Sequence, residues 1–365
     1  MNKRYRVIQW ATGSVGAEAL KGIVLDPRLQ LVGVKAFGPE KQGVDAGTLC
    51  GLPETGIRAT TSLDEILALD ADCVSYMPNR ASLEEVCALL RSGKNVACSP
   101  FLFYGENLPD PDRKKLEEAC RTGAASVYGS GIHPGFVGMV LPLALSGMSR
   151  TIDTVTVTER ADWGFYDNPK ITFENMRFGA PPEEVTPERN EFLAFNGEIF
   201  KDQIVMLARA FGAPLDEVTL DHETRTAPEG HDVICGRIEK DMVYAQRFTW
   251  KGICAGQERL VIDALWHVGG PYPEGWPRPR DGWTVTIEGE PSLQAHFISL
   301  ASFEHMGERS LADHTHASDI ATAMQVVNSI PALCDAAPGI RGTFELDRVH
   351  AGLAMRSPNI GPTSG

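Results

Sequence analysis

The chain has 365 residues, and its 48 acidic residues outnumber its 34 basic ones, which gives a formal net charge of −14. At about 150 residues per domain this length predicts two domains, and a hydrophobic content of 43% is enough to fill their cores. Because a chain this acidic repels phosphate groups, the composition argues against nucleic acid and membrane surfaces as partners.

Strand-like and helix-like segments alternate through the first part of the chain. β-Branched and aromatic runs predict strands, and apolar residues at helical spacing predict helices. The expected strands are 5–10, 29–37, 72–77, 95–98 and 125–129, and the expected helices are 14–24, 63–69, 82–91 and 111–121. Ser62 and Ser82 each stand three residues before a glutamate, a pattern typical of helix N-termini. The alternation predicts βαβ units and a mainly parallel sheet.

After about Pro142 the pattern changes. Residues 151–158 alternate between apolar and polar, which suits an antiparallel strand with one solvated face. The remaining segments are an amphipathic stretch over 191–211, strands over 232–250, 258–267 and 283–288, a Pro/Gly-rich connector over 269–282 and a helix over 317–330. We therefore predict an α/β fold with a Rossmann-type domain over 1–142 and an α+β domain, mostly antiparallel, over 143–316. The C-terminal helix and tail, 317–365, are expected to pack back on the first domain.

The first strand meets the first helix in a turn of small residues, Ala11, Thr12, Gly13, Ser14, Val15 and Gly16. Backbone N–H groups at a helix start, together with the positive end of the helix dipole, bind a pyrophosphate well. Gly13 would permit a close approach to the phosphate, and Gly16 would permit close packing of helix on strand. Ala11 replaces the first glycine of the usual G-x-G-x-x-G pattern. The position of the turn at the head of a βαβ series predicts a nicotinamide dinucleotide site rather than an ordinary glycine turn.

The end of the second expected strand bears on the choice between NAD and NADP. An NAD site usually has a carboxylate there for the ribose 2′-hydroxyl, but Glu40 is the first acidic residue and it lies later in the loop. Lys41, or less favourably Lys35, can contact a 2′-phosphate, the alternative being a solvated loop lysine. The sequence therefore favours NADP and leaves NAD as the alternative.

Five segments, spread over nearly the whole chain, occur in an order that is typical of one protein family. They are the turn at 11–16, the run Gly43-Val-Asp-Ala-Gly-Thr-Leu-Cys-Gly-Leu-Pro53, the run Gly129-Ser-Gly-Ile-His-Pro-Gly-Phe136, the run Met176-Arg-Phe-Gly179 and the run Ala321-Thr-Ala-Met-Gln-Val-Val-Asn-Ser-Ile-Pro331. Together they resemble the dihydrodipicolinate-reductase-like family that includes 2,4-diaminopentanoate dehydrogenase and the native amine dehydrogenases. The resemblance implies a Rossmann domain, then an α+β domain with substrate pocket and dimer contacts, and hence a homodimer. It also implies reversible hydride transfer between NAD(P)H and a C=O or C=N carbon.

Two departures from the family pattern concern the chemistry. A Glu-Glu pair of the amine-forming members falls on Pro100 and Phe101 here, and no carboxylate follows until Glu106. Ammonia activation needs a base near the reacting carbon, so the change argues against amination. An asparagine of the family pattern is His133 here, and an imidazole can donate a proton to a developing alkoxide.

These departures favour a carbonyl (ketone) reductase or dehydrogenase that acts on a hydrophobic small molecule. One alternative is an amine dehydrogenase that uses another base, such as Glu106. A second alternative is a dinucleotide-binding sensor that does not catalyse a reaction.

The candidate residues fall into three groups. The catalytic candidates are His133, Tyr104 and Glu106. His133 is alternatively a cofactor-contacting or structural histidine. Tyr104 and Glu106 follow the strand expected near the nicotinamide and are alternatively packing or surface residues. The cofactor candidates besides the turn and Lys41 are Met77, Pro78, Ser99 and Asn328. By the family resemblance, the substrate candidates are Phe101, Trp163, Tyr166, Phe173 and Met176. If this aromatic-rich set lines the pocket and is not ordinary core, the substrate is sizeable and largely apolar.

Other chemistry and other locations have little support in the sequence. His314 and His316 suggest a metal, but their spacing alone is not diagnostic and Ser318 or Asp319 is expected to cap a helix there, so no metal is predicted. There is no G-x-S-x-G elbow or P-loop lysine, which argues against hydrolases and NTPases. Eight scattered cysteines without a C-x-x-C pair, no secretory signal and no apolar run of the roughly 18–20 residues that span a bilayer together predict a cytoplasmic protein with reduced thiols.

Overall fold

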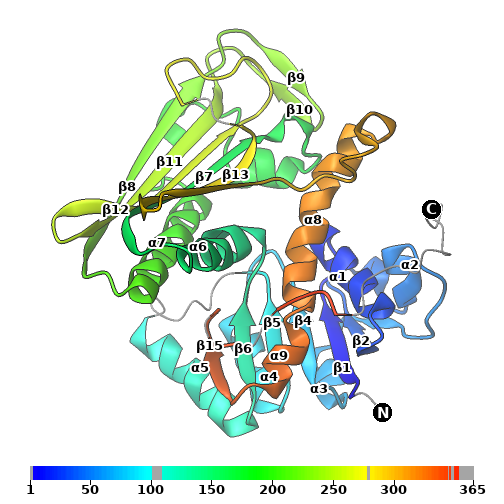
Figure 1. Ribbon diagram of the computed structural model, residues 1–365. Helices are drawn as coiled ribbons and strands as arrows, with labels where there is room; N and C mark the ends of the chain where they lie inside the picture. Colours follow the sequence, from blue (N-terminus) through cyan, green and yellow to red (C-terminus); the bar gives the residue numbers. More distant parts are fainter. Residues whose placement is uncertain (1–2, 101–108, 278–279, 344, 347–348, 353–365) are drawn as a thin grey trace. The chain divides into compact units, whose positions relative to one another are not determined.

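The computed structural model describes residues 3–100, 109–277, 280–343, 345–346 and 349–352, and the chain divides into two compact units (Figure 1). Unit 1 consists of Met1–Gly131 together with Asp319–Gly365, and unit 2 is the intervening segment Ile132–Ser318. The helix α8 (Leu311–Val327) contains the second boundary between the units. Unit 2 is therefore an insertion between two parts of the chain that build unit 1.

The core of unit 1 is a seven-stranded sheet in which every pair of neighbouring strands is parallel. Its strands are β1 (Tyr5–Trp10), β2 (Leu29–Lys35), β3 (Ala59–Thr60), β4 (Cys73–Tyr76), β5 (Asn95–Cys98), β6 (Ser126–Gly129) and β15 (Gly339–Arg341). The order β15-β6-β5-β4-β1-β2-β3 contains the doubly wound strand order of a Rossmann fold. The predicted α/β fold class with a parallel Rossmann-type sheet is confirmed.

Short helices connect the strands of unit 1. They are α1 (Ser14–Leu25), α2 (Ala46–Cys50), α3 (Leu63–Ala68), α4 (Leu83–Arg91), α5 (Asp110–Gly123) and α9 (Ile330–Asp335), with a 3-10 turn η1 (Pro39–Lys41). The Ser62 side chain accepts a hydrogen bond from the Glu65 N–H at 3.2 Å, and Ser82 accepts one from Glu85 at 3.3 Å. Both predicted helix starts are confirmed, since these side chains satisfy N–H groups that the helix itself leaves free.

Both faces of the unit 1 sheet are covered by apolar side chains, as a parallel sheet requires. One face packs around Ile8, Trp10 and Tyr76 against α3, α4 and α5. The other packs around Val7 and Ile23, and the C-terminal segment contributes to it through Ala323, Val326, Val327, Ile330 and Leu333. The last strand, β15, pairs with β6 at the edge of the sheet, where Figure 1 shows it in red beside the cyan strand.

The late helical segment differs from its prediction. The helix expected over 317–330 begins at Leu311, and the expected cap at Ser318 or Asp319 is wrong. Ser310 and Asp313 instead bond reciprocally, each side chain accepting the other's backbone N–H at 3.1 Å or less, which is a capping pattern. The helix ends at Val327, and Pro331 lies in the first turn of α9, where a missing N–H costs nothing.

Unit 2 is built on a six-stranded sheet in the order β14-β13-β7-β12-β11-β8. Its strands are β7 (Thr151–Asp162), β8 (Leu215–Thr226), β11 (Val243–Cys254), β12 (Gln257–His267), β13 (Gly282–Glu290) and β14 (Leu293–Phe297), with a separate hairpin of β9 (His231–Val233) and β10 (Gly236–Ile238). Only β7 and β12 pair in parallel, so the predicted second domain with a mostly antiparallel sheet is confirmed.

The helical elements of unit 2 are led by α7 (Glu191–Phe211), which packs on one face of this sheet. The others are η2 (Ile132–Val140), α6 (Leu141–Ser146), η3 (Trp163–Phe165), η4 (Lys170–Asn175), η5 (Pro182–Glu184) and η6 (Met306–Glu308). The Phe200 ring of α7 lies 4.5 Å from that of Trp250, whose indole N–H donates to the Gly197 carbonyl at 3.0 Å. These contacts bury the apolar face of the sheet.

Several segments of unit 2 differ from the prediction, among them the last strand, β14, which was not expected. The single strand expected over 232–250 is instead the β9–β10 hairpin followed by β11, because Asp241 turns the chain in the left-handed region with φ 65°. The strand β8 was not predicted, since its alternation is dominated by charged residues. It lies at the edge of the sheet, where both faces can carry polar side chains.

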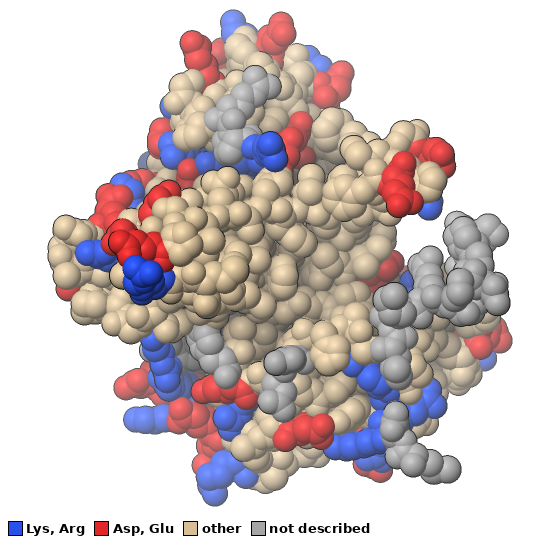
Figure 2. All heavy atoms as spheres, in the orientation of Figure 1, with Lys and Arg blue, Asp and Glu red and all other residues tan. Residues whose placement is uncertain are grey.

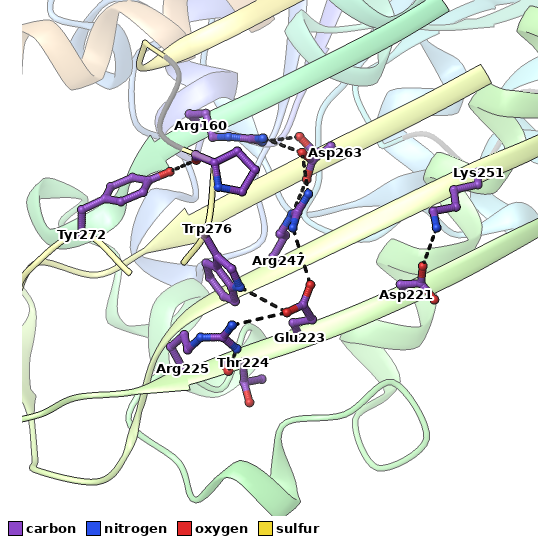
Figure 3. A network of polar contacts seen from close by, with 11 residues as sticks. Arg160, Asp221, Glu223, Thr224, Arg225, Arg247, Lys251, Asp263, Tyr272 and Trp276 are labelled. Atoms are coloured by element: carbon purple, nitrogen blue, oxygen red, sulfur yellow. Dashed lines mark hydrogen bonds and ion pairs between the residues drawn. The ribbon is translucent and has the colours of Figure 1, made fainter. Parts of the chain in front are cut away.

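The second face of this sheet carries a network of charged side chains (Figure 3). The Asp263 carboxylate accepts hydrogen bonds from Arg160 at 2.5 Å and from Arg247 at 2.9 Å, and the Arg160 side chain is only 2% exposed. The network continues to Glu223, which lies 3.6 Å from Arg247 and accepts the Trp276 indole N–H at 3.2 Å. Trp276 belongs to the predicted Pro/Gly connector, so the network fixes this connector to the sheet.

The surface has no large region of a single charge on the face that Figure 2 shows. Basic and acidic side chains occur side by side around the rim of that face. Within the described part of the chain, none of the helices combines the length and the apolar character of a membrane span.

Candidate functional site

The turn that follows β1 is held in shape by a buried glutamine. Ala11 adopts a left-handed conformation with φ 72°, in which a glycine would be relaxed. The Gln9 side chain is fully buried, and its amide donates hydrogen bonds to the carbonyls of Ala11 at 2.8 Å and Trp10 at 3.2 Å. The Ala11 N–H donates to the Lys35 carbonyl at 2.9 Å, so the turn begins on the strand ladder. Ala11 therefore replaces the first glycine of the motif and still adopts the left-handed backbone conformation that favours glycine.

The two glycines of the turn have different surroundings. A Cβ on Gly16 would stand 2.9 Å from the carbonyl carbon of Ala11 and nearer still to its oxygen, so α1 packs against the turn there with no spare room. A Cβ on Gly13 would meet no described atom within 4 Å. Gly13 is the N-cap of α1, and it has no side chain that could make a capping hydrogen bond to this helix start. Open space over uncapped helical N–H groups fits a pyrophosphate.

Lys41 reaches this turn, whereas Lys35 does not. The Lys41 ammonium donates hydrogen bonds to the Thr12 carbonyl at 2.9 Å and to the Thr12 hydroxyl at 3.1 Å. Lys35 is buried, with its ammonium over the rings of Phe37 at 4.5 Å and Trp10 at 5.5 Å, and burial lowers its pKa. Of the two lysines, Lys41 has the better position for a phosphate group next to the turn.

The other cofactor candidates lie at opposite ends of the strands of the unit 1 sheet. Met77 and Pro78 follow β4 and Ser99 follows β5, and both strands run parallel to β1. Because the carboxyl ends of parallel strands share one edge, these residues lie on the same edge as the turn, where dinucleotides bind in such folds. Asn328 is not brought together with them. Its side chain accepts a hydrogen bond from Arg28 at 3.2 Å, just before the amino end of β2.

His133 lies in η2 of unit 2 and is paired with a glutamate that the sequence did not suggest. Its Nδ1 is 2.5 Å from the Glu159 carboxylate, and its side chain is only 1% exposed. The other carboxylate oxygen of Glu159 accepts the Trp266 indole N–H at 3.0 Å. Among the described residues, His133 Nε2 is buried and has no hydrogen-bond partner. Because a carboxylate only accepts, Nδ1 carries a proton and Nε2 is the nitrogen available for chemistry.

The electrostatics favour an ionised Glu159. Burial alone would raise the pKa of its carboxyl group, but the hydrogen bond from His133 and the positive charge of that ring, with the Trp266 indole, outweigh burial and lower it. A carboxylate, an oriented imidazole and a free Nε2 form an arrangement that can exchange a proton with a bound molecule.

Aromatic residues connect this pair to the predicted substrate candidates. Trp266 lies 5.7 Å from the Trp163 ring, which in turn lies 5.8 Å from Tyr166 and 6.0 Å from Phe178. Trp163, Tyr166 and Phe173 are half-buried, whereas Met176 is 1% exposed. The structure thus brings Trp163 and Tyr166 into one cluster with the His133–Glu159 pair.

Some predicted residues have other surroundings or cannot be placed. Phe101, Tyr104 and Glu106 lie outside the described residues. His314 is bonded to the Ala301 N–H at 3.3 Å, and no cluster of three or more His, Cys, Asp or Glu in the described segments is arranged to hold a metal ion. All eight cysteines are free thiols.

Glu159 was missed because it is 26 residues from His133 and stands at the polar end of a strand. One signal could have found it. Val155, Val157 and Glu159 alternate along β7, so the glutamate continues the buried face of the strand. A charged residue in such a position needs a partner.

Comparisons with known proteins identify the family. No protein-family model matches the chain. An amine dehydrogenase from Streptomyces virginiae is 30% identical over 359 residues, covering 93% of this chain and 95% of that protein. The solved structure of an amine dehydrogenase from Mycobacterium smegmatis superimposes with a TM-score of 0.71 at 20% identity, covering 95% of this chain and 97% of that one.

A more distant solved structure has the same fold. GenD2 from gentamicin A biosynthesis, in complex with NAD, superimposes with a TM-score of 0.53 at 16% identity over 90% of this chain and 86% of that one. The resemblance seen in the sequence is thereby confirmed. The chain belongs to the amine dehydrogenase family and is an NAD(P)-dependent oxidoreductase.

Proposed function

We propose that the protein reduces the carbonyl group of an apolar organic molecule, with His133 as the proton donor. The observation that carries this proposal is the buried imidazole that Glu159 holds at Nδ1 while Nε2 has no partner among the described residues. The nicotinamide cofactor, when bound, supplies the hydride. The neighbouring cluster of Trp163, Tyr166 and Trp266 suits an apolar substrate.

The protonation state of the His133 imidazole determines the direction of the proton transfer. In the reduction, hydride adds to the carbonyl carbon and the C=O π pair moves to the oxygen. His133 Nε2–H protonates this oxygen, which yields the alcohol and a neutral imidazole that still donates Nδ1–H to Glu159. In the oxidation, the neutral Nε2 removes the hydroxyl proton of the alcohol as the hydride leaves the carbon.

Only two residues along the chain separate His133 from Ser130, which is anchored at the end of β6. The Ser130 N–H donates to the Cys98 carbonyl at 2.9 Å, which fixes the residue after β6 in unit 1. His133 is three residues further, and three extended residues span at most about 11 Å. This short connection along the chain supports the proposal that His133 takes part in the reaction.

Reductive amination is the second candidate function. Two relatives carry the name amine dehydrogenase, and a neutral imidazole can also accept a proton from ammonium, which releases nucleophilic ammonia. The test is oxidation of NADPH or NADH with a panel of aryl and alkyl ketones, with and without ammonium, followed by product analysis. We expect alcohol products and turnover that does not depend on ammonium, and a turnover loss of about 10²- to 10⁴-fold in His133→Asn. Amine products would replace the reductase proposal, and saturable cofactor binding without turnover would favour the sensor.

We further propose that NADP is the preferred cofactor and that Lys41 provides the preference. Lys41 lies in the loop that follows β2, the part of such folds that contacts the ribose 2′ position, and its ammonium is bonded to the Thr12 carbonyl at 2.9 Å. A hydrogen bond to a charged group contributes about 1.5–3 kcal/mol, so Lys41→Ala should weaken NADPH binding by about tenfold or more and leave NADH binding nearly unchanged. Fluorescence titration measures both, and Lys114→Ala, an exposed lysine on α5, is the control. An equal loss for both cofactors would contradict the assignment.

A further inference from the structure

We propose that Glu159 is the positioning residue of the reaction and that Trp266 fixes its carboxylate, an inference that rests on His133 as the proton donor. The three side chains come from three elements, η2, β7 and β12. None of them is adjacent to another in the sequence, so the arrangement is made by the fold of unit 2.

The two oxygens of the Glu159 carboxylate are bonded to different donors. One oxygen faces His133 Nδ1 at 2.5 Å, and the other accepts the Trp266 indole N–H at 3.0 Å. A carboxylate bonded at both oxygens cannot rotate without losing a bond, so its direction toward the imidazole is fixed. Trp266 is itself 4% exposed and packs against Phe248 at 5.5 Å, which makes it a rigid support.

The pair has the features of a working acid rather than of a structural ion pair. Buried polar groups in folded proteins are nearly always hydrogen-bonded, and a histidine that only stabilised the fold would use both ring nitrogens. Here Nδ1 is bonded, while Nε2 has no partner among the residues described. The Phe200 ring, 4.9 Å away and edge-on, limits rotation of the imidazole. Glu159 therefore holds one tautomer and one ring orientation, and its charge stabilises the imidazolium form.

The sheet of unit 2 contains a second glutamate, Glu223, whose substitution serves as a matched control for that of Glu159. Glu223 also accepts an indole N–H, from Trp276 at 3.2 Å, but it lies on the opposite face of the sheet in the network of Arg247 and Arg225. Glu223→Gln therefore removes a carboxylate from the same kind of indole contact without touching an imidazole. Glu159→Gln keeps the size of the side chain and removes the charge.

The first experiment does not depend on turnover. In the full-length protein labelled with ¹⁵N-histidine, NMR reports the tautomer and the Nδ1–H proton of each ring. We expect His133 to be protonated at Nδ1 with a proton shifted far downfield, and we expect this signal to be lost in Glu159→Gln and kept in Glu223→Gln. A His133 protonated at Nε2 alone, or a signal unchanged in Glu159→Gln, would overturn the inference.

The second experiment is a double-mutant cycle with His133→Asn, which introduces the amide usual in the family that the sequence resembles. We expect Glu159→Gln to lower kcat by about 10- to 100-fold with little change in KM, less than the about 10²- to 10⁴-fold cost of losing a general acid. In the His133→Asn background the same change should cost about twofold or less, because a positioning residue acts only through the group it positions.

The outcomes separate this inference from the proposed function. An equal loss of kcat from Glu159→Gln in both backgrounds means a structural role for Glu159 and overturns the inference. A wild-type protein without turnover on any carbonyl removes the proposed function, and the NMR signals still decide whether Glu159 orients His133. Glu223→Gln should retain wild-type kcat in the active protein.

Discussion

The two units are stabilised by different interactions, and their candidate sites are built from different groups. Unit 1 has a parallel sheet with apolar side chains on both faces, and its candidate site is mainly backbone, a turn and the start of α1. Unit 2 has one apolar face and one face with buried charges, and its candidate site consists of side chains. The comparison indicates that unit 1 depends on spacing between backbone segments, whereas unit 2 depends on complete sets of charged partners.

The largest effect is expected in the charged face of unit 2. Asp263→Asn leaves the Arg160 guanidinium, 2% exposed, without its carboxylate, and removing one member of a buried ion pair costs about 3–5 kcal/mol. Chemical denaturation should show this loss of unfolding free energy. Asp221→Asn is the control, because its pair with Lys251 is 62% exposed on the aspartate side and such pairs contribute about 0–1 kcal/mol. Similar losses in both variants would contradict the special dependence of unit 2 on its buried charges.

The next effect tests the backbone spacing in unit 1. Gly16→Ala places a methyl group against the Ala11 carbonyl, so helix and turn must separate. Overpacking of this kind costs about 1–3 kcal/mol, and thermal unfolding together with NADPH titration should show losses of both stability and affinity. A variant with wild-type stability and affinity would show that the turn tolerates movement.

Gly13→Ala provides the matched comparison within the same turn. Its methyl group meets no described atom within 4 Å, so the unfolding temperature should stay close to that of the wild type. The same methyl group occupies the space assigned to the pyrophosphate, and we expect dinucleotide affinity to fall about tenfold, or ~1.4 kcal/mol. Unchanged affinity, measured by the same titration, would remove the turn from the cofactor site.

The smallest effect is the pH dependence that Glu159 contributes to unit 2. Its pKa is lowered in the folded protein, so its stabilisation is present above the unfolded value near 4.5 and is lost as the pH falls through the lower folded value. Wild-type protein should therefore lose more unfolding free energy than Glu159→Gln between neutral pH and acid pH, as measured by urea denaturation. Parallel curves would mean that the charge of Glu159 does not stabilise the fold.

The difference between a backbone site in unit 1 and a side-chain site in unit 2 also explains which features could be predicted from the sequence. The strand–turn–helix of unit 1 lies in consecutive residues, and both Tyr5–Trp10 and the start of α1 at Ser14 agree with the prediction. The contact between His133 and Glu159 depends on the pairing of strands far apart in the chain, which no local pattern encodes. β8 was missed because charged residues dominate the alternation of this edge strand. The start of α8 was missed because polar residues dominate its first two turns.

The insertion of unit 2 has a consequence for the order of assembly. The apolar layer that contains Val7 and Ile23 also needs Ala323, Val326 and Ile330, which are synthesised only after the whole of unit 2. The part of unit 1 that precedes residue 132 therefore leaves the ribosome with one face of its sheet only partly covered. The remaining cover is synthesised after unit 2. Exposed apolar surface of this kind attracts chaperones and promotes aggregation, so a fragment ending at residue 131 would be a poor substitute for the intact nucleotide-binding unit.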